Sequence, residues 1–261
     1  MSINISMKRL WLPPLMLVTL ILATLLVAGC GTSGKKIDPY EGKSAEEIYE
    51  IGDSALKRSN YDTAIAAFKG LDAHYPFGQY TVAGQLNIIY AQYKDSQYPA
   101  ALIAAERFIR LHPRHPHLDY AYYMRGLIKF DENAGLLERV FPIDPSKRDI
   151  AAEQQSFTYF AELLRSYPNS HYAPDARLRM IYLRNILAQH ELYTADYYYR
   201  RGAYVASSVR AQYIIEHFDG AEVMPQALAL LARSYRALGL TDLAEDVERV
   251  NAFNYPEQTV S

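Results

Sequence analysis

The chain has 261 residues, of which half are apolar and 21% charged, so it can bury a sizeable core in one large domain or two small ones. A net charge of −2 argues against a nucleic-acid-binding protein, and a single cysteine excludes an intrachain disulfide. Tyrosine is unusually frequent, with 23 Tyr against 9 Phe. A ring with a polar tip suits thin, layered folds and binding surfaces.

The first thirty residues form a targeting segment. Lys8 and Arg9 precede an apolar run over residues 15–27, whose length fits a signal peptide better than a membrane span. The run ends in VAGC, which resembles a bacterial lipobox, and the only cysteine, Cys30, falls at the lipidated position. We therefore predict a lipoprotein signal peptide over residues 1–29 and a lipid anchor on Cys30. The alternative is an ordinary signal peptide with an incidental cysteine.

The residue after Cys30 indicates which membrane holds the lipid anchor. Several acyl chains on one residue anchor a protein stably, whereas one chain does so marginally. The next residue is Gly31, whereas in enteric bacteria an Asp there retains lipoproteins in the inner membrane. We therefore expect a lipid-anchored protein at the periplasmic face of the outer membrane. Residues 30–43 are polar and contain Gly and Ser, which indicates a flexible tether, and residues 257–261 form a short tail.

The body of the chain shows helical periodicity and no convincing strand. Ser44 and Glu47 have the spacing of a capping box. In the segment 44–76, the small residue Gly52 lets two helices approach closely, and Phe68 fills the gap to the next unit. This is the pattern of a tetratricopeptide repeat, a helix-turn-helix unit of about 34 residues.

A similar helix ending returns along the chain. These endings fall at residues 76, 113, 168, 219 and 256, and all but the fourth are prolines. Proline cannot continue a helix and biases the preceding residue away from helical geometry. We predict an all-α fold: a TPR-like α-α superhelix (solenoid) of about ten helices in five repeats, right-handed, with a core shared only between neighbours. The expected repeats are 44–76, 77–113, 117–168, 173–219 and 222–256. A single globular bundle is the alternative.

Two of the expected repeats are longer than the others. In the third, residues 131–148 form an insertion between the two helices. Its apolar side chains could pack back on the repeats or contact a partner. In the fourth, residues 174–201 read as one unusually long helix.

No catalytic or metal-binding motif stands out. Three histidines lie in HPRHPH (112–117), but Pro113 and Pro116 make this an extended connector whose side chains diverge, which favours a solvated turn over a metal site. The signatures G-x-S-x-G, Walker A and H-E-x-x-H do not occur. We expect no enzyme activity, no metal and no cofactor.

Two tyrosine clusters are candidates for recognition. Tyr120, Tyr122 and Tyr123 crowd one helix, and Tyr197–Tyr199 with Arg200 and Arg201 crowd another. Either cluster could pack between helices or form a recognition surface, since Tyr and Arg are enriched at binding hot spots.

Five stretches carry a resemblance to a known family. They read LDAHYPFGQY, QLNIIYAQYK, ERFIRLHPRHPHLDYAYYMRGL, LLRSYPNSHYAPDA and ADYYYRRGAYVA. Together with the lipobox and the number of helix pairs, they resemble the BamD (ComL) family of the outer-membrane β-barrel assembly (BAM) machinery, over essentially the whole mature chain.

The resemblance implies a non-catalytic scaffold with several partners. These are BamA, through the last of its periplasmic POTRA domains, other lipoproteins of the BAM complex, and the C-terminal segments of unfolded barrel proteins. The C-terminal repeats would bind BamA, with Arg201 as the expected contact; Arg200 leaves that assignment open, and Tyr197 is a further candidate. The N-terminal repeats would form the substrate pocket, for which the candidates are Tyr61, Tyr75, Pro76, Phe77, Gly78 and Tyr80.

Within this pocket we expect Phe77 to be partly exposed to the groove. An extended segment with a terminal aromatic residue suits a groove of Tyr and Pro, because ring burial supplies free energy and hydroxyls can bond its backbone. Another function stays possible with the same anchor and fold, namely a repeat lipoprotein that docks cell-wall (peptidoglycan) enzymes. An enzyme or a solute-binding lipoprotein is a third class, disfavoured because no reactive set of residues is visible.

Overall fold

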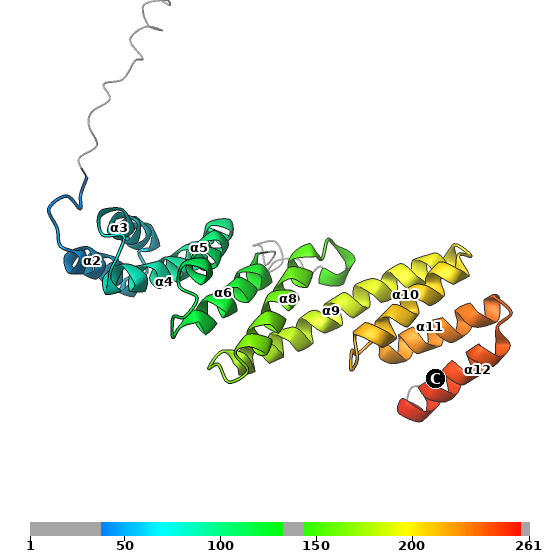
Figure 1. The fold of residues 1–261 in the computed structure, drawn as a ribbon. Coiled ribbons are helices and arrows are strands. Elements are labelled where there is room, and N and C mark those ends of the chain that lie inside the picture. Colours follow the sequence, from blue (N-terminus) through cyan, green and yellow to red (C-terminus); the bar gives the residue numbers. More distant parts are fainter. Residues whose placement is uncertain (1–37, 133–143, 257–261) are drawn as a thin grey trace, which may run out of the picture. The chain divides into compact units, whose positions relative to one another are not determined.

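The computed structural model describes residues 38–132 and 144–256. It divides into a first unit, Met1–Glu41, and a second unit, Gly42–Ser261. The predicted signal peptide, the predicted lipidation site Cys30 and the predicted tail 257–261 lie outside the described residues. Over the described part of the second unit the chain forms ten α-helices, one 3-10 turn and no strand (Figure 1).

The ten helices fall into two groups of five on either side of the third-repeat insertion. The first group is α2 (Ala45–Lys57), α3 (Tyr61–His74), α4 (Gln79–Lys94), α5 (Tyr98–Leu111) and α6 (Leu118–Asp131). The second group is α8 (Ala151–Ser166), α9 (Ala173–Arg200), α10 (Tyr204–His217), α11 (Met224–Ala237) and α12 (Thr241–Asn254). The 3-10 turn η1 spans Pro145–Lys147.

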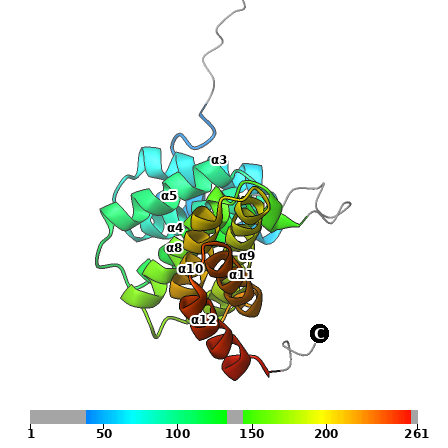
Figure 2. The ribbon, with the colours of Figure 1, turned by 90° about the vertical axis from the view of Figure 1, so that its right-hand side faces the viewer.

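Within the second unit, each helix packs on the next one in the chain. Contacts also join α2 to α4, α4 to α6, and α9 to α11. The helices therefore follow one another in chain order in Figure 1, and Figure 2 looks along this row with α12 nearest the viewer. The principal contacts join neighbours or next neighbours, which is the pattern of a repeat array and not of a bundle around one centre. The predicted all-α, TPR-like fold is confirmed.

The second helix of each pair ends in the same way. Each helix stops at a residue whose φ is about −130° and whose ψ is about +60°. The N–H of that residue donates a hydrogen bond to the carbonyl oxygen four residues earlier. These residues are Tyr75, His112, Tyr167, Phe218 and Tyr255, each one position before a predicted ending. Phe218 precedes Asp219 and still adopts this geometry, so proline is not its only cause.

Glycines allow close contacts between helices, as expected for Gly52. A Cβ on Gly52 would lie 2.6 Å from the ring of Phe68, and one on Gly84 would lie 3.2 Å from that ring. Phe68, only 2% exposed, therefore joins α2 to α4 of the next repeat. In the third repeat, Phe160 of α8 lies against Gly126 of α6 in the same close way.

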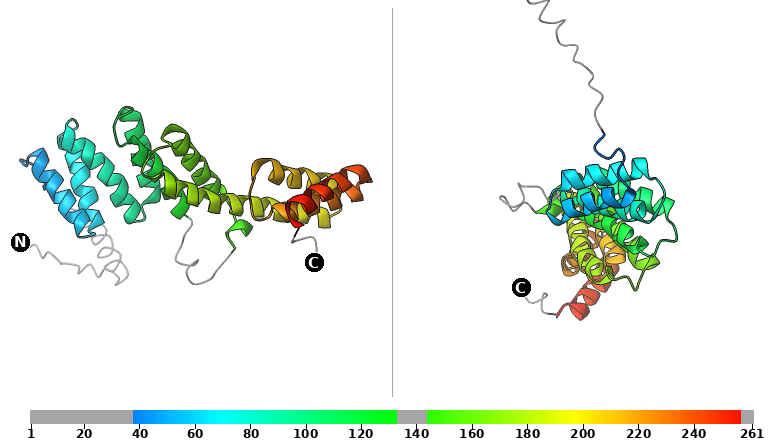
Figure 3. Two further views of the ribbon diagram at one scale, coloured as in Figure 1. Left: turned by 90° about the horizontal axis from the view of Figure 1, so that it is seen from below. Right: turned by 90° about the vertical axis from the view of Figure 1, so that its left-hand side faces the viewer.

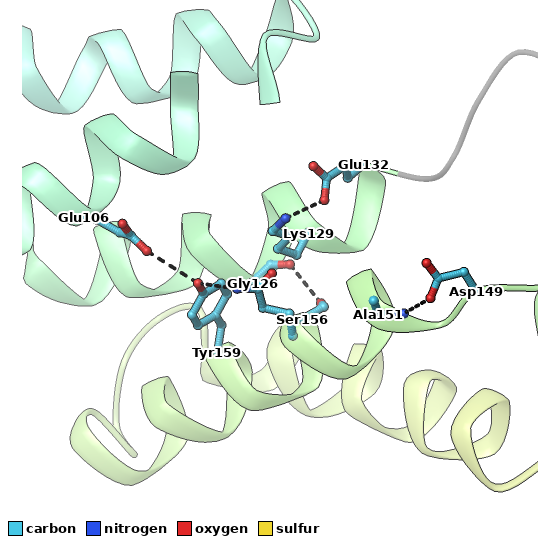
Figure 4. Close-up of polar contacts among 9 residues, drawn as sticks. Glu106, Gly126, Lys129, Glu132, Asp149, Ala151, Ser156 and Tyr159 are labelled. Atoms are coloured by element: carbon cyan, nitrogen blue, oxygen red, sulfur yellow. Dashed lines mark hydrogen bonds and ion pairs between the residues drawn. The ribbon is translucent and has the colours of Figure 1, made fainter. Parts of the chain in front are cut away.

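The pairing of α6 and α8 is reinforced by a buried hydrogen bond. The Ser156 hydroxyl donates to the carbonyl oxygen of Gly126 at 2.9 Å (Figure 4). Tyr159, on the same helix as Ser156, reaches back to Glu106 of α5 at 3.4 Å. The third repeat is thus joined to the second by polar as well as apolar contacts.

The segment 131–148 separates the two helices of the third pair, from Asp131 at the end of α6 to Ala151 at the start of α8. Residues 133–143, which include its apolar side chains, lie outside the described residues. The following turn η1 is held to α9: Tyr193 donates to Asp144 at 2.8 Å, and a ring nitrogen of His190 lies 2.8 Å from the Ser146 carbonyl oxygen.

The long helix expected over 174–201 is confirmed as α9, Ala173–Arg200. Figure 3 shows it reaching from α8 to α10 and α11, and the packing contacts agree. One continuous helix therefore carries residues from the third-repeat boundary to the Tyr-Arg cluster.

Candidate binding surfaces

The first candidate surface is the α3–α4 connector, Tyr75–Gly78. The Tyr75 hydroxyl donates to the carbonyl oxygen of Lys43 at 2.7 Å, and the Tyr75 carbonyl accepts from the Thr81 hydroxyl. Gly78 has a φ of +130°, a backbone region that favours glycine, and it caps α4. The connector is therefore fixed at both ends, while its middle projects from the helices.

Aromatic side chains of this surface differ in exposure. Phe77 is 91% exposed and Tyr75 is 38% exposed. The Tyr80 ring lies 5.6 Å from the Tyr49 ring, and a hydrogen bond to Glu46 raises the pKa of Tyr80. Phe77 is thus a large apolar group that the described residues leave almost uncovered.

The six substrate-pocket candidates do not all come together. Tyr75–Gly78 and Tyr80 are contiguous, but Tyr61 begins α3 at its opposite end. A 14-residue helix is about 20 Å long. Tyr61 therefore lies a helix length away from the connector.

The second candidate surface lies at the C-terminal end of α9. Arg200 pairs with Asp196 one turn earlier, at 2.9 Å. The guanidinium of Arg201 stands over the Tyr197 ring, 5.3 Å from its centroid. Tyr197 is 49% exposed and Arg201 is exposed, so both present polar and aromatic groups to solvent.

The tyrosines at this end of α9 have different roles. The centroid of the Tyr199 ring lies 5.3 Å from that of Tyr204 on α10. The guanidinium carbon of Arg233, on α11, lies over the Tyr199 ring, 4.9 Å from its centroid. Tyr199 therefore holds three helices together, and Tyr197 faces outward. The ion pair between Asp196 and Arg200 could be predicted from the sequence, because the two residues are four positions apart on one helix. No signal in the sequence pairs Arg233 with Tyr199.

The other tyrosine cluster packs between repeats. Tyr123 stacks on Tyr172 with centroids 4.7 Å apart and donates to Asp175 at 2.6 Å. Burial raises the pKa of Tyr123 to about 12. The ring centroids of Tyr122 and Tyr167 lie 5.4 Å apart. The structure favours the packing interpretation over a recognition surface here.

The histidine-rich connector packs on Phe108. The ring centroids of His112 and His115 lie 4.8 Å and 5.2 Å from that of Phe108, and His112 contacts Gln85 at 2.7 Å. Across the described ranges, no group of three or more His, Cys, Asp or Glu side chains could hold a metal ion. Nor is any helix in that part of the chain long and apolar enough to cross a bilayer.

A cavity of about 290 Å³ that sequence reasoning missed lies among α3, α4 and α5. None of the six substrate-pocket candidates lines it. Its lining residues come from three helices, so only the folded arrangement brings them together.

Fold and surfaces together define a class: a TPR-like helical repeat protein that exposes aromatic and arginine side chains near the ends of its helices. The comparisons with known proteins narrow this class. Residues 41–250 match the family model described as "YfiO: Outer membrane lipoprotein". "Outer membrane protein assembly factor BamD" of Neisseria meningitidis is 39% identical over 243 residues, covering 93% of this chain and 91% of the relative.

Other relatives carry the same description. BamD of Xylella fastidiosa is 37% identical over 245 residues, covering 94% of this chain and 84% of the relative. BamD of Vibrio cholerae is 36% identical over 234 residues, covering 90% of this chain and 96% of the relative. The chain belongs to the BamD (YfiO) family of outer membrane protein assembly factors.

Solved structures show only a weak likeness. A thermophilic TPR protein from Thermus thermophilus aligns with a TM-score of 0.39 at 14% identity, covering 82% of this chain and 93% of that one.

Proposed function

We propose that the chain is a non-catalytic scaffold lipoprotein of the BAM complex. Anchored to the outer membrane through Cys30, it binds BamA and other lipoproteins of the complex, and it receives unfolded β-barrel proteins for insertion. The observation that carries this proposal is 39% identity to a BamD protein over 93% of the chain. The exposed groups at the α3–α4 connector and at the end of α9 support it.

For the substrate, we place the contact at the α3–α4 connector. An extended segment that ends in an aromatic residue can bury that ring against Phe77, whose surface is 91% exposed. The connector is held by Tyr75 on one side and Gly78 on the other, so Phe77 is displayed from a fixed backbone. A pre-ordered contact loses less conformational entropy on binding.

For BamA, we place the contact at Arg201. Arg200 already pairs with Asp196, whereas Arg201 has no carboxylate partner among the described residues. A guanidinium with free donors can form a bidentate pair with a carboxylate of a POTRA domain. Stacking on Tyr197 holds the Arg201 head near the surface without using those donors.

Co-isolation of the anchored chain tests this function. The full chain, processed in a Gram-negative host and gently extracted with its membrane, should bring down BamA and further BAM lipoproteins. A Cys30→Ala variant controls for the anchor, because it should lose membrane association while its repeats stay folded. Cell-wall hydrolases or synthases in place of BamA would instead favour the docking alternative.

A further inference from the structure

Two connectors of the array carry exposed arginines that have no acidic partner. Arg110 and Arg114 lie at the end of α5 and in the α5–α6 connector, and Arg165 and Arg177 flank the α8–α9 connector. None of the four pairs with a carboxylate among the described residues; Arg177 donates only to the Pro168 carbonyl oxygen, at 3.3 Å. We call these four arginines the basic edge.

Direct contacts hold the two connectors side by side. The Ser170 hydroxyl, in the α8–α9 connector, donates to the Asp119 carboxylate at the start of α6 at 2.7 Å. The ring of Tyr167 also packs against that of Tyr122 on α6. The arginines of both connectors therefore belong to one continuous surface.

Carboxylates near the basic edge are already engaged. Asp175 pairs with Arg179 at 2.6 Å, and Glu162 pairs with Arg125 at 3.1 Å. Asp119 accepts the hydrogen bond described above. The positive charge of the basic edge is therefore left for a group outside the chain.

The basic edge contrasts with the two ends of the array. The first helix, α2, and the last helix, α12, each carry four carboxylates against one cation. The whole chain has a net charge of −2. Positive charge is thus gathered at one place in a chain that is acidic elsewhere, so an extended anionic surface would attract this edge and repel the terminal helices.

We propose that the basic edge binds the phosphate headgroups of an anionic phospholipid bilayer and turns this side of the array toward the membrane. A guanidinium forms paired hydrogen bonds with phosphate oxygens, and basic side chains are attracted to an anionic lipid surface. The inference rests on the proposed lipid anchor, which keeps a bilayer near the chain and makes a weak contact effectively intramolecular. It goes beyond the proposed contacts with BamA and substrate.

The layout of the basic edge favours a bilayer over an acidic protein segment. Its arginines are distributed over two connectors, and none of them lines the cavity among α3, α4 and α5. Lipid headgroups move laterally and can match any spacing of cations, whereas a protein segment needs a fixed register. Leu111, 54% exposed next to Arg110, adds an apolar side chain that can enter the headgroup layer.

A fluorescent label tests the contact in the full lipidated chain. The only natural cysteine is Cys30, which the lipid would block, so an introduced thiol can be labelled selectively with bimane. Asn169→Cys places the label in the α8–α9 connector. Lys94→Cys is the control, because it lies just before α5 and the length of that helix, about 20 Å, separates it from the α5–α6 connector.

The labelled chains are reconstituted in nanodiscs that contain nitroxide-headgroup lipid as quencher. At pH 7.5, where histidine is mostly neutral, quenching at Asn169→Cys should be about twofold greater with phosphatidylglycerol present than in phosphatidylcholine alone. About 0.5 M salt should remove the difference, because it screens exposed charges. Quenching at Lys94→Cys should not depend on the lipid.

Variants then locate the contact. Arg114→Gln with Arg165→Gln removes one charge from each connector and should abolish the dependence on phosphatidylglycerol. Arg114→Lys with Arg165→Lys keeps the charges and should retain most of it. Arg58→Gln, which removes an exposed arginine at the α2–α3 turn, should have no effect. Thermal melting establishes that each variant is folded.

The proposal is overturned by equal quenching at Asn169→Cys in the two kinds of nanodisc, or by unchanged quenching in the folded double glutamine variant. Binding of a polyglutamate peptide to the edge without any dependence on the lipid would also overturn it and would assign the edge to an acidic protein segment. A chain that separates from the nanodiscs contradicts the proposed anchor instead. Flotation of that chain and its variants with phosphatidylglycerol and phosphatidylcholine vesicles then tests the basic edge directly, so the two proposals fail separately.

Discussion

The ring of Phe160 lies so close to the backbone of Gly126 that a Cβ on that glycine would stand 2.5 Å from two ring carbons. Phe160 is fully buried, so its ring has no free space to move into. The adjacent hydrogen bond from Ser156 to the Gly126 carbonyl fixes the same spacing between α6 and α8. Glycine at this position sets how closely the two helices of the third pair approach.

Gly126→Ala should destabilise the protein. Overpacking a filled core costs about 1–3 kcal/mol, and the better helix propensity of alanine returns at most about 1 kcal/mol. Urea unfolding should show a lower free energy of unfolding. Adding Phe160→Leu should recover part of the loss, because the two sites share one space. A Gly126→Ala variant as stable as the parent would contradict this packing.

Acid should weaken one inter-repeat contact. Burial tends to raise the pKa of Asp175, but hydrogen bonds from Tyr123 and Arg179, both at 2.6 Å, outweigh it and lower that pKa. The folded pKa is thus below the unfolded value of about 3.9. The stabilisation is present above about pH 4 and is lost as pH falls through the folded pKa.

Asp175→Asn tests this contact. Because the Asp175 side chain is 47% exposed, solvent screens the ion pair, and the loss at neutral pH should be below about 1 kcal/mol. The difference from the parent chain should shrink below about pH 4, where the parent loses the same charge. Thermal melts across this pH range measure it. A difference independent of pH would show that the charge of Asp175 contributes nothing.

Phe77→Ala should affect binding and leave stability unchanged. Phe77 is 91% exposed, and surface substitutions usually change stability by less than about 0.5 kcal/mol. Binding of a barrel-protein C-terminal peptide to the full chain, followed by fluorescence anisotropy, should weaken several-fold. Phe253→Ala is the matched control, because Phe253 is 86% exposed on α12 and should leave peptide binding intact. Equal peptide binding by both variants would exclude Phe77 as a substrate contact.

The helices and their ends could be predicted because they depend on local rules. The capping box at Ser44 and Glu47 formed as expected, since it involves residues three positions apart. The ending at Phe218-Asp219 is predicted although no proline follows. Its backbone matches the proline-bearing ends, so the following proline is not required for this geometry.

The surfaces were harder to read from the sequence. Tyr61 was grouped with Tyr75 from the resemblance, but a full helix separates them. The contact between Tyr199 and Arg233 joins α9 to α11, and the cavity joins three helices across two repeats. Such groupings depend on how helices are stacked, which hydrophobic periodicity does not specify.

The scaffold account depends most directly on Arg201. Arg201→Glu should weaken binding of the full chain to the periplasmic region of BamA by about 1–3 kcal/mol, the range for losing a hot-spot side chain. Arg200→Glu is the matched control and should have a smaller effect, because Asp196 already pairs with Arg200. The decisive measurement is the dissociation constant of each folded variant by isothermal titration calorimetry. The account predicts a rise of about 5- to 150-fold for Arg201→Glu; an unchanged constant would contradict it.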